Sequence, residues 1–317
     1  MPKTAKKTSS RSSRKQKLPT ENMKVKLPGI LQFSKTVLGT LVAHRSVFLR
    51  LLALASIVSL MLSAQATYTY YTDLVQVTKE LAKQMPELTG SPVTKAVTLT
   101  VAVVNGASNS TLAGAQQLFL GMLHLLMWLI VVWLLRHLLS GNVVKLRDGL
   151  YSAAAPLIST CLVVLAGLVQ LLPLALIVSL MVGIGSTGVA SGFVWGLVAL
   201  VVLVLFSALT IYWLAGTVFA AVIVTLPNTY PWAALRSARQ VISGYRREVV
   251  LRLVWLGFLV CIAMFAVVMA TVLLDVLTGY KISGLVVLVS QVMGVALFIY
   301  SSAYVYLLYR GVIDERS

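Results

Sequence analysis

Hydrophobic residues along this chain gather into six long stretches separated by polar and charged segments. A helix that crosses a bilayer needs about 20 mostly apolar residues, and each stretch reaches or nearly reaches that length. The stretches are Phe48–Ala66, Leu118–Leu139, Ala153–Met181, Val194–Leu214, Val249–Leu274 and Leu285–Leu308. The fourth could continue to Leu226. The pattern predicts an all-α polytopic membrane protein with about six transmembrane helices.

The composition agrees with a membrane protein and excludes a soluble globular domain. Of the 317 residues, 59% are hydrophobic and 11% are charged, and the mean hydropathy is +0.92. Soluble domains are about half apolar and about a quarter charged. The first apolar stretch does not resemble a cleavable signal peptide, because the basic region in front of it is far longer than the n-region of such a peptide.

Lys and Arg residues are sorted to one side of the apolar stretches. Segments that alternate along the chain carry 22 of the 26 basic residues, including twelve within residues 1–50. Basic segments of a membrane protein stay in the cytoplasm. We therefore expect both termini in the cytoplasm, residues 65–117 to form an extracytoplasmic loop, and the chain to lie in the cytoplasmic (inner) membrane of a bacterium. The net charge of +17 favours anionic lipid headgroups as partners.

The regions outside the spans offer little for a separate domain. Residues 1–22 are rich in Lys, Arg, Ser and Thr, and we expect a disordered cytoplasmic tail. Its cluster Arg11–Lys17 could touch nucleic acid or anionic lipid, but we expect a solvated arm and no nucleic-acid partner. Residues 23–317 then form the membrane domain. The loop 65–117 is short for an independent domain, so we expect a cap packed on the bundle, with a short helix over Tyr71–Met85.

Three of the apolar stretches are preceded by a segment with the spacing of an amphipathic helix. In two of them apolar or small residues recur at identical offsets: Val143, Leu146, Leu150, Ala153 and Leu157 in one, and Leu235, Ala238, Ile242, Tyr245 and Val249 in the other. The first segment, Leu27–Arg50, shares letters with the third: Arg45-Ser-Val-Phe-Leu-Arg-Leu-Leu aligns with Arg247-Glu-Val-Val-Leu-Arg-Leu-Val. The pattern suggests three repeated helix hairpins, each introduced by a cytoplasmic amphipathic helix. The alternative is the basic flank that any multi-spanning protein has just inside its spans.

Basic residues on these segments are the candidate lipid- or anion-binding residues. A basic amphipathic helix lies in the membrane interface, with its apolar face in the headgroup boundary and its arginines on lipid phosphates. The candidates are Arg45, Arg50, Lys145, Arg147, Arg236, Arg239, Arg246, Arg247 and Arg252. Arg50 and Arg252 lie one turn inside their spans. They either reach back to anchor the helix against phosphate or line an inward-facing anion-binding vestibule.

The third segment also resembles a known family. Leu226-Pro227, followed by Pro231-Trp-Ala-Ala-Leu-Arg-Ser-Ala-Arg-Gln-Val-Ile-Ser-Gly-Tyr-Arg-Arg, is similar to a motif of the glycerophosphoryl diester phosphodiesterase membrane-domain family and related bacterial membrane proteins. Lys145-Leu-Arg-Asp-Gly-Leu-Tyr-Ser-Ala-Ala-Ala-Pro resembles the corresponding earlier element. The likeness covers the layout of residues 25–310 but the motif of only about forty residues, and Ala238 stands where the family often has an aromatic residue. The resemblance implies an all-helical membrane domain of undetermined role. It does not imply diesterase activity, which resides in a separate soluble barrel.

Groups for catalysis or metal binding are scarce. Metal sites need several converging His, Cys or carboxylate ligands, and the three histidines, His44, His124 and His137, are spread over separate segments. No acid lies deep in a predicted span. This argues against proton-coupled transport, because intramembrane carboxylates mark proton and cation pathways. We therefore expect no enzyme activity, no metal and no cofactor.

Two glutamines are the main polar candidates inside the spans. Gln170 and Gln291 either bond to a neighbouring helix or line a transport path. Cys161 and Cys261 lie in different spans, so no disulfide framework is expected, and Asp275 lies at the outer end of the fifth span. Aromatic residues near the predicted span ends look like interfacial belts: Tyr68, Tyr70 and Tyr71 outside, and Trp232, Tyr304, Tyr306 and Tyr309 inside.

These observations favour a non-enzymatic integral membrane protein that organises or binds anionic lipid, a membrane partner, or both, through basic amphipathic helices. The alternative is a transporter or lipid-handling permease with a path between the repeated hairpins. In that case Arg50, Arg252 and the two glutamines would face a cavity. A polar cavity midway through the membrane would favour this alternative, and a dry bundle would count against it. Substrate, partner and oligomeric state leave no signature in the sequence.

Overall fold

The computed structural model describes residues 28–84, 91–106, 114–142, 144–186, 193–226 and 229–314, and every regular element in them is a helix. The all-α prediction is confirmed. The tail 1–22 lies outside the described residues.

In the described part of the chain, six helices are long and apolar enough to cross a membrane, as the sequence predicts. They are α2 (Arg45–Gln84), α5 (Gly114–Leu139), α7 (Leu157–Ser186), α8 (Phe193–Ile223), α10 (Arg246–Leu277) and α11 (Ser283–Asp314). Each exceeds the apolar run that predicts it, since a helix continues through polar residues until its backbone is interrupted. By helix length and hydropathy the chain is a multi-pass membrane protein.

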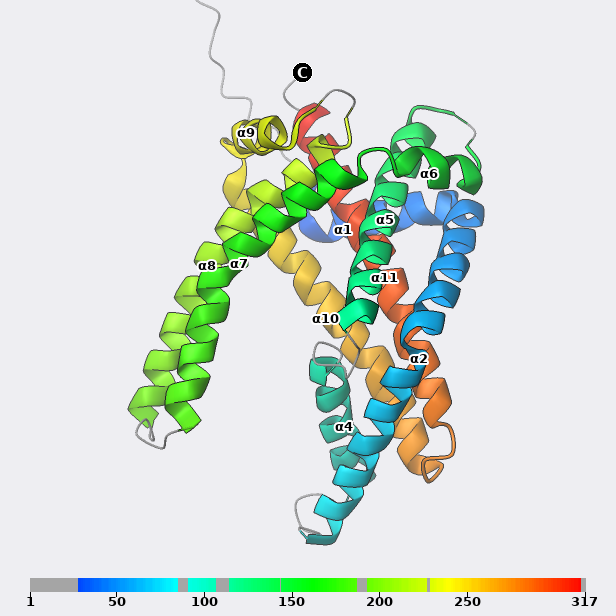
Figure 1. The fold of residues 1–317 in the computed structure, drawn as a ribbon, viewed down its shortest axis with the longest axis vertical. Coiled ribbons are helices and arrows are strands. Elements are labelled where there is room, and N and C mark those ends of the chain that lie inside the picture. Colours follow the sequence, from blue (N-terminus) through cyan, green and yellow to red (C-terminus); the bar gives the residue numbers. More distant parts are fainter. Residues whose placement is uncertain are drawn as a thin grey trace, which may run out of the picture.

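Four shorter helices complete the described fold: α1 (Ile30–Ala43), α4 (Pro92–Gly106), α6 (Leu146–Ala153) and α9 (Pro231–Ile242). Figure 1 shows α1, α6 and α9 at one end of the long helices and α4 toward the other. We call the end that carries α1, α6 and α9 the basic end, because Arg45, Arg147 and Arg236 lie there. Along the chain α1 precedes α2 and α5, α6 precedes α7 and α8, and α9 precedes α10 and α11. That these units are copies of one plan stays a prediction.

A short non-helical stretch separates each short helix of the basic end from the span that follows. Pro156 precedes α7, and the stretch Ser243-Gly244-Tyr245 separates α9 from α10. Proline lacks the N–H of a helix interior and glycine weakens a helix. The apolar face predicted over Leu235–Val249 is therefore divided between two helices. Pro231 stands at the first position of α9, where its missing N–H costs nothing.

Residues 65–117 are helical over most of their described length, which differs from the predicted loop. Residues 45–84 contain neither Pro nor Gly, so α2 runs on for 40 residues, or about 60 Å. The far half of α2 and α4 pack against α10 and α11. The cluster that joins them consists of Tyr71, Val75, Ala96, Leu99, Val268, Val272, Val286 and Val287. The expected cap is thus a packed extension of the spans.

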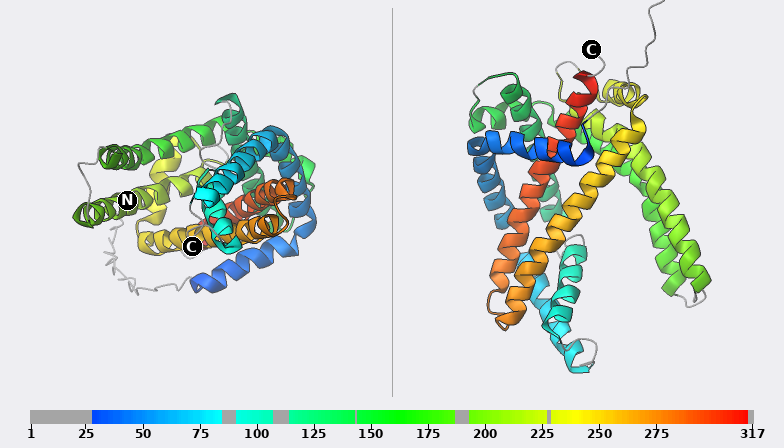
Figure 2. Two further views of the ribbon diagram at one scale, coloured as in Figure 1. Left: turned by 90° about the horizontal axis from the view of Figure 1, so that it is seen from below. Right: turned by 180° about the vertical axis from the view of Figure 1, so that it is seen from behind.

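The α7–α8 hairpin projects away from the other spans (Figure 1, Figure 2). Only 11% of the most apolar window of α7 and 6% of that of α8 are buried, against 22–39% in the other four long helices. The hairpin joins the bundle at its root, the last turns of α8, where Ala215, Phe219 and Ala220 are fully buried. This root belongs to the main core at the basic end, which also contains Leu134 and Tyr304.

Candidate functional site

Helix α9 has the two faces that its sequence predicts. Ala234, Ala238 and Ile242 are buried, while Arg236 and Arg239 are exposed. The apolar face, however, packs against α8 and α7, whereas we expected it to enter the headgroup boundary. Small alanine side chains allow this close approach, and burial against protein removes the same apolar surface from water. The basic face of α9 is the one that stays exposed.

The nine candidate residues occupy three environments. Seven are exposed at the basic end: Arg45, Arg50, Lys145, Arg147, Arg236, Arg239 and Arg247. Arg246 is half-buried, and Arg252 is buried, with 4% of its surface exposed. Over the described residues none of the nine forms an ion pair with a carboxylate. Among the described residues these positive charges therefore have no carboxylate at ion-pair distance.

Arg50 and Arg252 were matched by sequence position, but the structure places them differently. Arg50 is exposed. Arg252 lies beneath α1, where its Nη2 donates to the Pro28 carbonyl oxygen at 2.8 Å and its guanidinium carbon is 5.3 Å from the centroid of the Phe33 ring. Its Nη1 is buried without an acceptor. Neither arginine lines any of the cavities described below, so neither supports the predicted vestibule.

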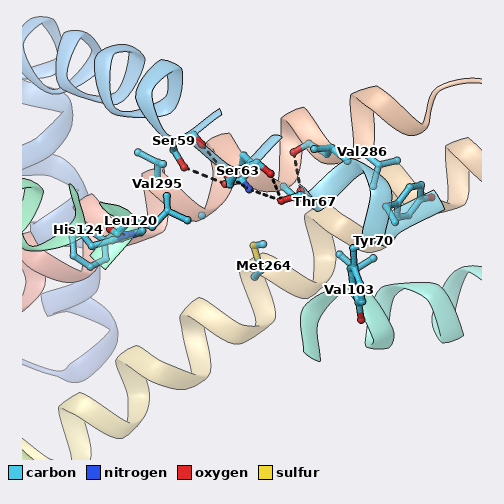
Figure 3. Close-up of a pocket in the computed structure, with 16 residues that line it drawn as sticks. Ser59, Ser63, Thr67, Tyr70, Val103, Leu120, His124, Met264, Val286 and Val295 are labelled. Carbon is cyan, nitrogen blue, oxygen red and sulfur yellow. Dashed lines mark hydrogen bonds between the residues drawn. The ribbon is translucent and has the colours of Figure 1, made fainter. Parts of the chain in front are cut away.

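A polar pocket lies between the spans (Figure 3). Ser59, Ser63 and Thr67 stand four residues apart on one face of α2, within hydrogen-bond distance of Gln291 of α11. Ser59 Oγ donates to Gln291 Oε1 at 3.3 Å, and Gln291 Nε2 donates to Ser63 Oγ at 2.9 Å and to Thr67 Oγ1 at 3.2 Å. The cavity beside this network has a volume of about 290 Å³. The four-residue spacing of hydroxyls on α2 is visible in the sequence and is the signal that indicates this polar face.

His124 of α5 also lines this pocket. Its Nδ1 lies 2.7 Å from the Leu120 carbonyl oxygen. A carbonyl oxygen needs a donor, so Nδ1 carries a proton in this geometry. Hydroxyls, an amide and an imidazole line the cavity, and no Lys, Arg, Asp or Glu among the described residues does. Such a lining suits an uncharged polar molecule better than an ion.

Asp275 holds the opposite end of the bundle together. It is fully buried, and Tyr71 Oη and Ser283 Oγ donate to its Oδ2 at 2.8 and 2.9 Å. The Ile282 N–H donates to Oδ1 at 2.9 Å. Burial, and after it this carboxylate, raises the pKa of the Tyr280 phenol in the turn between α10 and α11. The carboxylate joins α2, α10 and α11.

The belt prediction is wrong for three of its tyrosines. Tyr71 is buried against Asp275, and Tyr304 and Tyr306 are buried in the main core. Tyr68 and Trp232 are exposed, as a belt requires. A tyrosine near a span end has the same hydropathy whether it packs in the core or lies at the membrane interface. The sequence therefore does not distinguish a core tyrosine from a belt tyrosine.

Comparison with known proteins adds no further constraint. The chain matches no protein-family model, no curated protein and no solved structure. The resemblance of Pro231–Arg247 to the membrane-domain family therefore stays a prediction. Among the described residues no three His, Cys, Asp or Glu side chains lie close enough to hold a metal ion, and Cys161 and Cys261 are unpaired.

Proposed function

We propose that the protein is a non-enzymatic inner-membrane protein whose basic end lies in the cytoplasm and binds anionic lipid headgroups. One observation carries the proposal: seven exposed Lys and Arg side chains at one end of the spans have no carboxylate partner among the described residues. A basic side chain near an anionic leaflet contributes roughly 1 kcal/mol. The apolar face of α9 packs on α8 and α7, which holds Arg236 and Arg239 on the exposed surface of the basic end.

Neutralising part of this surface is expected to reduce the preference for anionic lipid. The variant replaces Lys145, Arg147, Arg236 and Arg247, all exposed, by glutamine. At roughly 1 kcal/mol for each, we expect the ratio of bound phosphatidylglycerol to phosphatidylethanolamine to fall at least about tenfold. Native mass spectrometry of the purified protein with the mixed lipids measures this ratio.

The matched control removes the same number of charges from the other end. Lys79, Lys83, Lys95 and Lys281 are the four basic residues outside the basic segments, and their replacement by glutamine should leave the ratio unchanged. Equal ratios for the two quadruple variants would contradict the proposal.

The polar pocket supports a second candidate function, a permease for a small uncharged solute. Its support is the cavity of about 290 Å³ beside Gln291, since Gln291 is one of the four residues expected to face a transport path. Gln170 borders a different cavity and bonds to Thr217 at 2.8 Å. A transport path would require water to enter the pocket.

Cysteine labelling tests for that water. With Cys161 and Cys261 replaced by alanine, Thr67→Cys is expected to react with a small water-soluble thiol reagent, because Thr67 lines the cavity. Ser56→Cys lies on the same helix, is buried and borders no described cavity, so it should stay unreactive. Protection of both positions would rule the permease function out.

A further inference from the structure

At the basic end α9 passes over the α7–α8 hairpin (Figure 1). A second polar cavity lies between these helices and the start of α10. Its volume is about 390 Å³. The polar side chains that line it come from four helices. They are Gln170 of α7, Tyr212, Trp213 and Thr217 of α8, Arg239 of α9 and Arg246 of α10.

Arg246 is held firmly at the wall of this cavity. Its Nη2 donates to the Tyr212 carbonyl oxygen at 2.8 Å, and its guanidinium carbon lies 3.5 Å from the centroid of the Tyr212 ring. Its Nε is buried and has no acceptor among the described residues. The protein therefore satisfies the guanidinium only in part, and the residue still lines the cavity.

The other polar groups are donors as well. Gln170 Oε1 accepts from Thr217 Oγ1 at 2.8 Å, which leaves the Gln170 amide N–H groups free to donate. Arg239 adds a second guanidinium, and no carboxylate lines the cavity. Two guanidinium groups and an amide donor around one space match an anion with several acceptor oxygens, as a phosphate has.

The surroundings favour a phosphate that is attached to a lipid. Tyr212 and Trp213 are 46% and 43% exposed beside the cavity, as aromatic residues at a membrane interface often are. Farther along α8, away from its root, Leu209 and Leu205 are exposed. An acyl chain can follow this apolar surface while its phosphate lies between the arginines.

We propose that the cavity between α7, α8, α9 and the start of α10 is a binding site for the phosphate group of an anionic membrane lipid. The proposal rests on the proposed lipid-binding function and adds one defined site to a diffuse basic surface. The two differ in a measurable way: the site depends on the shape of the cavity, and the surface depends only on charge.

Filling the cavity without changing charge tests the site. A Cβ atom added at Gly216, which lines the cavity, would meet no other atom within 4 Å. Gly216→Leu therefore occupies the space and also favours the helix. We expect the most tightly bound phosphatidylglycerol to lose affinity about tenfold in native mass spectrometry of the full chain, and Arg239→Gln with Arg246→Gln to cause a similar loss. Binding like that of the wild type in Gly216→Leu would overturn the proposal.

Two variants separate this site from general effects. Gly257 borders a different, apolar groove of about 830 Å³ between α5, α8, α10 and α11, and its Cβ position is equally open. Gly257→Leu should keep the tight lipid, as should Gly216→Ala, which leaves most of the cavity empty. Equal loss in Gly216→Leu and Gly257→Leu would contradict a defined site.

Two further measurements identify the source of the phosphate and distinguish the defined site from the general lipid-binding surface. Millimolar inorganic phosphate should not displace phosphatidylglycerol from the wild type, and displacement would overturn the lipid assignment in favour of free phosphate. The quadruple glutamine variant at Lys145, Arg147, Arg236 and Arg247 should keep the tight lipid within about twofold while losing general selectivity for anionic lipid. Loss of the tight lipid there would overturn the site and leave the lipid-binding surface standing.

Discussion

Replacing Asp275 by leucine is expected to destabilise the fold by at least about 2 kcal/mol. The change leaves the Tyr71 hydroxyl and the part-buried Ile282 N–H without an acceptor, while the Ser283 hydroxyl keeps only the Tyr280 carbonyl oxygen at 3.4 Å. Each donor left without an acceptor costs about 1–3 kcal/mol. Tyr71→Phe removes one of the bonds and should cost about 1.5–3 kcal/mol, the value of a hydrogen bond to a charged group. Thermal unfolding in detergent, followed by circular dichroism, measures both.

Asp73 provides the control for this experiment. It is exposed and lies on α2 two residues beyond Tyr71, so Asp73→Leu should unfold at nearly the temperature of the wild type. If Asp275→Leu unfolds at the same temperature as Asp73→Leu, the buried carboxylate does not hold α2, α10 and α11 together.

Phe219→Ala is expected to cost about 3–5 kcal/mol, the usual range for truncating a buried phenylalanine. Phe219 is fully buried at the root of the α7–α8 hairpin, where its ring stands edge-on to that of Tyr309 of α11, with 5.9 Å between the centroids. Since the rest of the hairpin makes few contacts with the bundle, the cavity is created where the hairpin has most of its support. The same unfolding measurement applies.

Phe258→Ala is the matched substitution at an exposed position. Phe258 of α10 is 56% exposed, so its truncation should change stability by well under 1 kcal/mol in comparison. A loss at Phe219 no larger than at Phe258 would show that the root does not carry the hairpin.

The sequence predicts those features that depend on local pattern. Hydrophobic length alone identifies all six spans, and the spacing of Ala238 and Ile242 identifies the buried face of α9. The helix expected over Tyr71–Met85 is present as far as Gln84. Its continuity with the first span was missed because the hydropathy falls between them, although neither Pro nor Gly interrupts α2.

Features that depend on a distant partner could not be predicted in this way. Arg50 and Arg252 have matching neighbours in sequence, yet α1 covers only Arg252. Ser63 and Gln291 are 228 residues apart, and nothing near either residue in the sequence identifies the other. The cavity between α7, α8, α9 and the start of α10 depends in the same way on helices that meet only in the folded protein.

Because the α7–α8 hairpin buries few of its residues against the bundle, the bilayer is a structural component of this protein. In a bilayer the neighbours of most of the hairpin are hydrocarbon chains, because most exposed residues of α7 and α8 are apolar and the groove at Gly257 is open. Chain length and bilayer thickness then act on the protein much as core packing acts on a soluble domain. A short-chain detergent should change its conformation as a large-to-small core mutation would, with no residue altered.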